Sequence, residues 1–185
     1  GTFGYDIELI STHQELVLLK GENGKSVVAV SPAWQGRVMT SSLAGPEGKS
    51  LGWINHELIQ SGRTEKHIHS YGGEDRFWLG PEGGQFSIYF KPGAPFTFEN
   101  WFVPEEIDTK SFDIIDQSLS EVRFRKAMSL WNYSNIRFDL LVERQVKLLD
   151  HEEVSGLIGL PTSGLDLVAY ETDNTITNTG KNAWT

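Results

Sequence analysis

The chain of 185 residues contains no cysteine. A disulfide framework, a thiolate nucleophile and a cysteine-ligated zinc site are therefore excluded, so any metal would need His, Asp or Glu ligands. The sequence also lacks an apolar run of the roughly 20 residues that a membrane-spanning helix requires, and we expect no insertion into a bilayer. Nothing at the start resembles a signal peptide, but Gly1 is no initiator residue, so a removed leader stays open. The compartment is undetermined, with a periplasmic or extracellular location as our expectation.

Positive charge is scarce, because Lys and Arg total 16 against 25 Asp and Glu, which gives a formal net charge of -9. Nucleic acids and anionic membranes reward clustered Lys and Arg, so neither is an expected partner. Gly-rich phosphate loops, a serine nucleophile elbow and kinase signatures are also missing from the sequence. We expect no cofactor, and neutral or cationic small molecules remain open as ligands. A chain of this length can bury a sizeable core and is predicted to form one domain over residues 1–185.

Alternation of apolar and polar residues dominates what is present. The clearest run covers residues 136–148, where apolar side chains alternate with charged or amide side chains. This period of two predicts a long strand with one buried face. A similar run at residues 120–130 precedes it, and the turn-forming segment 132–135 lies between them. We therefore predict a long hairpin over residues 120–149.

Shorter strands are predicted on both sides of a single helical segment at residues 53–60. They cover residues 5–10, 15–20, 26–30, 37–41, 76–79 and 85–90. Breakers such as Asn23-Gly24 and Gly83-Gly84 separate them. The aromatic-rich residues 91–110 have little regularity and are predicted to fold over a sheet as an ordered loop. Many short strands with few helices indicate an all-β antiparallel sandwich or barrel.

Charged and aromatic residues crowd the glycine-flanked segment, residues 72–84. Its paired glycines permit unusual backbone geometry and close approach of a ligand. Between them, Glu74 and Asp75 offer acceptors, Arg76 offers a planar donor fork and Trp78 offers an apolar plate. Sugars need this mixture for their hydroxyls and C–H faces. The alternative interpretation is a glycine-rich hairpin held by a salt bridge.

Histidines form the second candidate site, at His67 and His69. If the segment is extended, both imidazoles lie on one face. The pair suits proton transfer in a sugar pocket, a metal site completed by Glu74 or Asp75, or ordinary polar positions in a loop. Adjacent Glu74 and Asp75 would face opposite ways in a strand, which disfavours glycoside hydrolysis by that pair. Arg37 follows Gly36 at a predicted strand start, where a ligand contact and a buried ion pair are both open.

Three segments of the chain resemble the galactose mutarotase-like superfamily, which includes aldose 1-epimerases and uncharacterised bacterial relatives. Residues 30–38 carry a Gly36-Arg37 pair before an apolar strand. Residues 72–82 carry the paired glycines, and residues 170–180 look like a strand that leads into an Asn-rich turn. The resemblance covers most of the chain in order. It implies a large antiparallel sandwich called a supersandwich, of which this chain would be the N-terminal part.

The resemblance also implies sugar chemistry. In aldose 1-epimerases a His acts as general acid on the ring oxygen and a late Glu acts as general base, and this Glu would fall beyond Thr185. We expect His67 or His69 as the acid, Arg37, Glu74, Asp75, Arg76 and Trp78 as substrate-binding residues, and no metal. The family's Asn-x-Arg signature is replaced by Gly-Glu-Asp-Arg. An epimerase acting on a sugar or oligosaccharide, a noncatalytic sugar-binding module and a structural domain therefore compete, and the oligomeric state is open.

Overall fold

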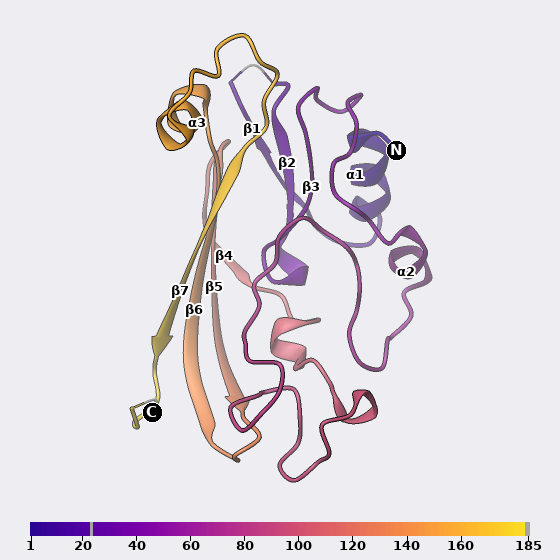
Figure 1. Cartoon of the computed structure of the whole chain (residues 1–185). Coiled ribbons are helices and arrows are strands. Elements are labelled where there is room, and N and C mark those ends of the chain that lie inside the picture. Colours follow the sequence, from indigo (N-terminus) through magenta and orange to yellow (C-terminus); the bar gives the residue numbers. More distant parts are fainter. Residues whose placement is uncertain (23, 184–185) are drawn as a thin grey trace.

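The computed structural model of the chain describes residues 1–22 and 24–183, so Asn23 of the expected turn and the terminal Trp184 lie outside the described residues. Strands dominate and form two antiparallel sheets (Figure 1). The first contains β1 (Val17–Lys20), β2 (Val27–Ser31) and β3 (Arg37–Ser42), in that order. The expectation of an all-β architecture built from antiparallel strands is confirmed.

The second sheet has four strands in sequence order: β4 (Asp113–Gln117), β5 (Glu121–Trp131), β6 (Arg137–Leu148) and β7 (Tyr170–Asn178). β5 and β6 pair from Glu121 with Lys147 to Trp131 with Arg137, which confirms the predicted long hairpin. Its turn contains Asn135 in a left-handed conformation with φ of 61°, a conformation that asparagine tolerates better than most residues.

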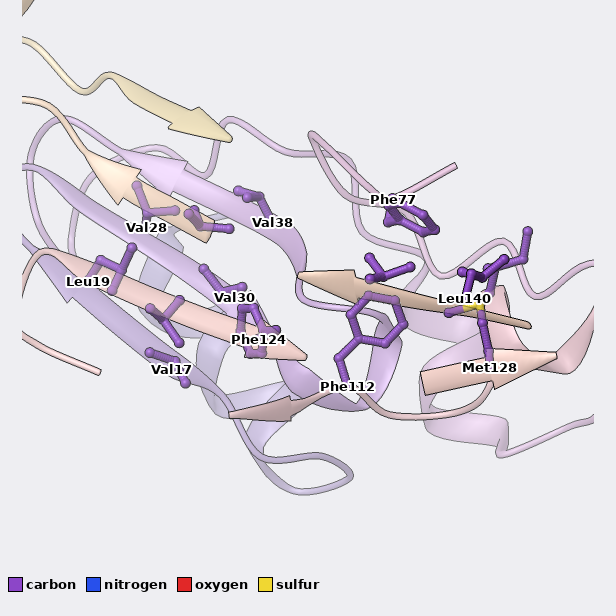
Figure 2. Close-up of a cluster of buried hydrophobic side chains, with 14 of the residues drawn as sticks. Val17, Leu19, Val28, Val30, Val38, Phe77, Phe112, Phe124, Met128 and Leu140 are labelled. Atoms are coloured by element: carbon purple, nitrogen blue, oxygen red, sulfur yellow. The ribbon is translucent and has the colours of Figure 1, made fainter. Parts of the chain in front are cut away.

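Both sheets contribute side chains to one buried hydrophobic cluster (Figure 2). Val28, Val30 and Val38 come from the three-stranded sheet, and Phe124 and Val142 come from the four-stranded sheet. All five are fully buried. Since burying each such side chain contributes about 1.5–3 kcal/mol, this shared cluster fixes the two sheets against each other.

The prediction of a strand at residues 5–10 is wrong. This segment belongs to helix α1 (Phe3–Ser11), which begins where the Thr2 hydroxyl accepts a hydrogen bond from the Tyr5 amide at 3.3 Å. Its buried residues are Phe3, Asp6, Leu9 and Ile10, a spacing of three and four that places them on one helix face. α1 packs against the face of β2 that carries Val27 and Ala29. Strand-like composition concealed this helical spacing.

Three other predictions need correction or trimming. The helical segment predicted at residues 53–60 becomes α2 (His56–Ser61), which starts after the N-cap Asn55. Residues 76–79 and 85–90 form no strand, so those two predictions are wrong. Most of their backbone lies in irregular loops, in which Gly84 has a φ of 85°. The last helix, α3 (His151–Ile158), begins with a capping box between Asp150 and Glu153.

The aromatic-rich loop holds two short 3-10 helices, η2 (Phe98–Asn100) and η3 (Glu105–Ile107), and a third, η1 (Pro32–Trp34), links β2 to β3. Trp101 of this loop packs against the core cluster, as expected for an ordered loop. Within the part of the chain that is described, no helix is long and apolar enough to cross a membrane.

Candidate functional site

The glycine-flanked segment runs alongside β3. The Val38 amide donates to the Asp75 carbonyl at 2.9 Å, and the Glu74 amide donates to the Val38 carbonyl at 2.8 Å. Gly72 and Gly73 have φ values of 94° and 114°. A Cβ on Gly72 would lie 2.1 Å from the Trp53 carbonyl oxygen. Glycine is therefore required here both for its backbone conformation and for the close approach to residue 53.

The half-buried Asp75 pairs with Arg144 of β6. The Arg144 side chain is completely buried, and its Nε and Nη1 donate to the Gly36 carbonyl at 2.9 Å and to Asn174 Oδ1 at 2.8 Å. Its remaining nitrogen, Nη2, donates a hydrogen bond to the Asp75 carboxylate. Asp75, a predicted substrate-binding residue, is thus engaged in an ion pair that joins the glycine-flanked segment to β6 and β7.

The Glu74 carboxylate also has hydrogen-bond partners within the protein. Its Oε1 accepts hydrogen bonds from the Ser41 amide at 2.7 Å and from the Ser41 hydroxyl at 2.9 Å. Burial raises the pKa of the Tyr170 phenol, and the negative charge of Glu74 and its hydrogen bond add to that rise. The Glu74 carboxylate therefore lies between β3 and the start of β7, with Ser41 and Tyr170 as neighbours.

Arg37 and Arg76 lie on the other face of this segment, beside Asp108. Arg37 is 2% exposed and donates from Nη1 to the Gly72 carbonyl at 2.9 Å. Burial and the nearby charge of Arg76 lower the pKa of Arg37 to about 9, and Asp108 opposes that decrease. Arg76 Nη2 donates to the Ile107 carbonyl at 2.6 Å and lies 4.0 Å from Asp108 Oδ1. Burial also lowers the pKa of Arg76.

His69 is buried and both of its ring nitrogens have partners. Nδ1 lies 2.8 Å from Asp108 Oδ2, and Nε2 accepts the Glu65 amide at 3.0 Å. A nitrogen that accepts an amide proton carries none itself, so Nδ1 holds the proton and donates it to Asp108. The His69 amide also donates to this carboxylate, at 3.1 Å to Oδ2. His69 therefore positions Asp108 and has no ring nitrogen left for a ligand.

His67 has a different environment. Its Nδ1 lies 2.6 Å from the Trp101 carbonyl oxygen, which can only accept, so Nδ1 is the protonated nitrogen. Its ring centre lies 4.5 Å from that of Phe98 and 4.8 Å from that of Phe102. Nε2 has no partner among residues 1–22 and 24–183. The pKa of Glu99 is lowered mainly by hydrogen bonds from Thr97 and its own backbone, with a smaller part from the charge of His67.

Trp78 belongs to a row of rings that we call the aromatic row: Trp78, Tyr89, Trp101, Phe98 and His67. Neighbouring ring centres along it lie 5.2, 5.6, 6.2 and 4.5 Å apart. The Arg76 guanidinium lies over the Trp78 ring at 4.4 Å, and Trp78 Nε1 donates to Glu82 Oε1 at 2.9 Å. Phe98 is 65% exposed, while the central Tyr89 is 1% exposed. The row thus starts at the half-buried Trp78, passes through the buried Tyr89 and reaches the surface at Phe98 beside His67.

The predicted site residues separate into three groups. In the first group, Arg37, Arg76 and His69 surround Asp108. In the second, Glu74 hydrogen-bonds to β3 and Asp75 pairs with Arg144 of β6. In the third, His67 and Trp78 lie at the two ends of the aromatic row. In the described part of the chain, no three His, Asp or Glu side chains gather as metal ligands. Glu82 was a secondary candidate from the sequence. Sequence reasoning missed Asp108, which no local motif marks, and Phe98, whose only signal was a position among aromatics.

The chain matches the family of unknown function DUF6786 over residues 1–185, and it therefore belongs to this family. No curated protein and no solved structure matches it.

Proposed function

We propose that this member of DUF6786 recognises carbohydrate, with the aromatic row and its charged neighbours as the binding surface, on a sandwich of the galactose mutarotase-like type. The single observation that carries the proposal is the aromatic row itself. Partly exposed rings stand beside Arg76 at one end and His67 at the other. Sugars present C–H faces that pack on aromatic rings and hydroxyls that bond charged planar groups, so this combination suits them.

The polar groups at the row support a sugar rather than an apolar ligand. Glu82 holds the Trp78 indole through its N–H, which fixes the ring's orientation. The Arg76 side chain retains an exposed fraction of 21% and places its guanidinium over the Trp78 ring. A free Nε2 on His67 adds a group that can accept a hydroxyl proton. Glu82 and Arg76 thus place hydrogen-bonding groups beside Trp78, and His67 places one at the other end of the aromatic row.

A second candidate function is aldose 1-epimerase-like isomerisation, and His67 favours it. General acid catalysis on a ring oxygen needs a nitrogen that is free to carry and deliver a proton. His67 Nε2 meets that condition, whereas both ring nitrogens of His69 are occupied. We therefore assign the acid role to His67 if the protein is an enzyme. Ring opening, rotation about the first carbon–carbon bond and reclosure would then exchange the anomers.

Titration calorimetry with a panel of aldoses and short oligosaccharides tests the proposal. Trp78→Ala should weaken binding by roughly tenfold, as expected for the loss of an aromatic contact worth about 1.4 kcal/mol. Phe98→Ala should weaken it by a smaller factor. Trp131→Ala is the matched control, because Trp131 is 52% exposed and lies outside the aromatic row. Binding that survives Trp78→Ala and Phe98→Ala unchanged would refute the assignment to this surface.

Exchange NMR at the anomeric centre separates the enzyme from the binding module. An epimerase should accelerate exchange over buffer, and His67→Ala should slow that exchange by about 10²–10⁴-fold. His13→Ala serves as the control, since His13 is exposed. Sugar binding without acceleration would leave the noncatalytic function and exclude the isomerase.

A further inference from the structure

Arg37 has an unused hydrogen-bonding edge. Although the residue is 2% exposed, only Nη1 of its guanidinium donates, to the Gly72 carbonyl. Nε and Nη2 are buried and have no partner in residues 1–22 and 24–183. These two nitrogens form the side edge of the guanidinium, whose parallel N–H bonds match the two oxygens of a carboxylate or phosphate. The orphaned edge therefore has the geometry of an oxyanion receptor.

Strand register places further donors in a row with Arg37. Ser31 of β2 lies opposite Arg37, and the bridge between Val38 and Asp75 brings Arg76 to its other side. Opposed residues of antiparallel strands share a face. Ser31 Oγ and Arg76 Nε are also buried without a partner. Four of the six such atoms in the described residues thus belong to the row of Ser31, Arg37 and Arg76, which we call the donor row.

Charge at the donor row is unbalanced. Asp108 is the carboxylate that Arg37 and Arg76 share, and Arg76 Nη2 lies 4.0 Å from its Oδ1. Asp108 already accepts hydrogen bonds from the amide and ring of His69. Two guanidinium groups therefore face one carboxylate, inside a chain whose formal net charge is -9. A buried cation without full compensation is costly, so a second anion would relieve this imbalance.

We propose that the donor row is an oxyanion-binding site and that its ligand is an acidic sugar, either a sugar carboxylate or a sugar phosphate. The sugar part of this inference rests on the proposed function. Arg76 connects the donor row to the aromatic row, because its guanidinium lies 4.4 Å from the centre of the Trp78 ring and its side chain is 21% exposed. The overall negative charge opposes binding only weakly, since charges farther than about 8 Å are screened at physiological ionic strength.

The experiment compares four probes by titration calorimetry: glucose, glucuronate, glucose 6-phosphate and inorganic phosphate. Charge-assisted bidentate bonds predict that one or both acidic sugars bind about 10- to 100-fold more tightly than glucose. Arg76→Gln should remove that preference. Arg123→Gln is the matched control, because Arg123 is 51% exposed in its side chain and carries its own surface pair with Glu121.

Arg37→Gln is expected to disturb folding, so the unmodified protein supplies the second measurement. The Nε–Hε signals of Arg37 and Arg76 in ¹⁵N-edited NMR spectra should shift on addition of glucuronate, glucose 6-phosphate or inorganic phosphate, while that of Arg123 should not. The carboxylate and phosphate arms then identify which oxyanion the row prefers.

Three outcomes are decisive. Equal affinity for glucose and both acidic sugars, with unmoved arginine signals, would overturn the oxyanion site and leave sugar recognition standing. Inorganic phosphate that shifts Arg37 and Arg76 while no sugar binds would uphold the oxyanion site and refute the proposed function. Tighter binding of an acidic sugar, abolished by Arg76→Gln and kept in Arg123→Gln, supports both.

Discussion

Arg144 in β6 binds the carboxylate of Asp75 in the glycine-flanked segment, across 69 residues of sequence. The Arg144 side chain is fully buried, whereas that of Asp75 retains an exposed fraction of 33%. This pair therefore holds the segment that carries Arg76 and Trp78 against the four-stranded sheet. The position of Arg76 and Trp78 in the candidate site depends on this pair, of which only Asp75 lies next to them in sequence.

We expect Asp75→Asn to lower the free energy of unfolding by about 2–3 kcal/mol. Removing one member of a buried ion pair leaves the other charge uncompensated, which typically costs about 3–5 kcal/mol, and the partial exposure of Asp75 reduces that cost. Urea denaturation measures the change. Asp173→Asn is the control, since Asp173 lies on exposed β7. A loss for Asp75→Asn no larger than that of the control would show that the pair does not hold the segment.

Gly72→Ala should be far more destabilising than Gly84→Ala. Both glycines have positive φ, 94° and 85°, so an alanine at either position meets about 1–2 kcal/mol of backbone strain. Only at Gly72 would the new Cβ also meet a backbone atom, 2.1 Å away at the Trp53 carbonyl, because nothing lies within 4 Å of the corresponding position at Gly84. Thermal unfolding of the two variants gives the comparison, and similar melting temperatures would contradict the close packing at Gly72.

Residue patterns over short stretches of sequence, such as alternation and turn-forming segments, predicted the elements that depend on neighbouring residues. The hairpin of β5 and β6 followed from the alternation of apolar and polar residues and from turn residues around Asn135, and both held. α1 was missed because its apolar composition resembles a strand, although Thr2 as N-cap and the spacing of Phe3, Leu9 and Ile10 were available signals. Residues 76–79 resemble a strand by composition, yet they form none, although Phe77 is buried in the core cluster.

The candidate site was predictable only in part, for a related reason. Gly72 to Trp78 lie close in sequence, so their proximity needed no knowledge of the fold. Asp108 joins Arg76 and His69 only because η3 brings it back beneath them, and long-range contacts of this kind leave no local trace. Arg37 meets Arg76 through strand register, which the sequence does not encode as a motif. The separate surroundings of His67 and His69 likewise depend on distant partners.

Stability should fall above pH 10, and Tyr89 should account for part of the loss. Burial, followed by the negative charge of Glu82, raises the pKa of Tyr89 above the ordinary value. As pH rises through about 10, the unfolded chain releases this proton first, so the stabilising contribution is full below pH 10 and decreases above it. Between about pH 9 and 11 the expected loss from this one group is about 1 kcal/mol.

Denaturant unfolding at about pH 9 and about pH 11 tests whether Tyr89 causes this loss of stability. Tyr89→Phe should lose less stability over the interval than the unmodified chain, whatever its stability at pH 9. Tyr5→Phe is the control, because Tyr5 is 52% exposed. An identical pH dependence in Tyr89→Phe and the unmodified chain would assign the loss to other groups.

The histidine tautomers provide the most direct test of the site. His69 and His67 each direct Nδ1 toward an oxygen that accepts, so both should carry the neutral-state proton on Nδ1. His56 should carry it on Nε2, because that nitrogen lies 2.7 Å from Asp6 Oδ1. Long-range ¹H–¹⁵N NMR at about pH 8, where an ordinary imidazole is neutral, distinguishes the two tautomers. Asp108→Ala should release the constraint on His69 alone. If His69 instead shows a proton on Nε2, the Glu65 amide does not occupy that nitrogen, and His69 returns as a candidate acid beside His67.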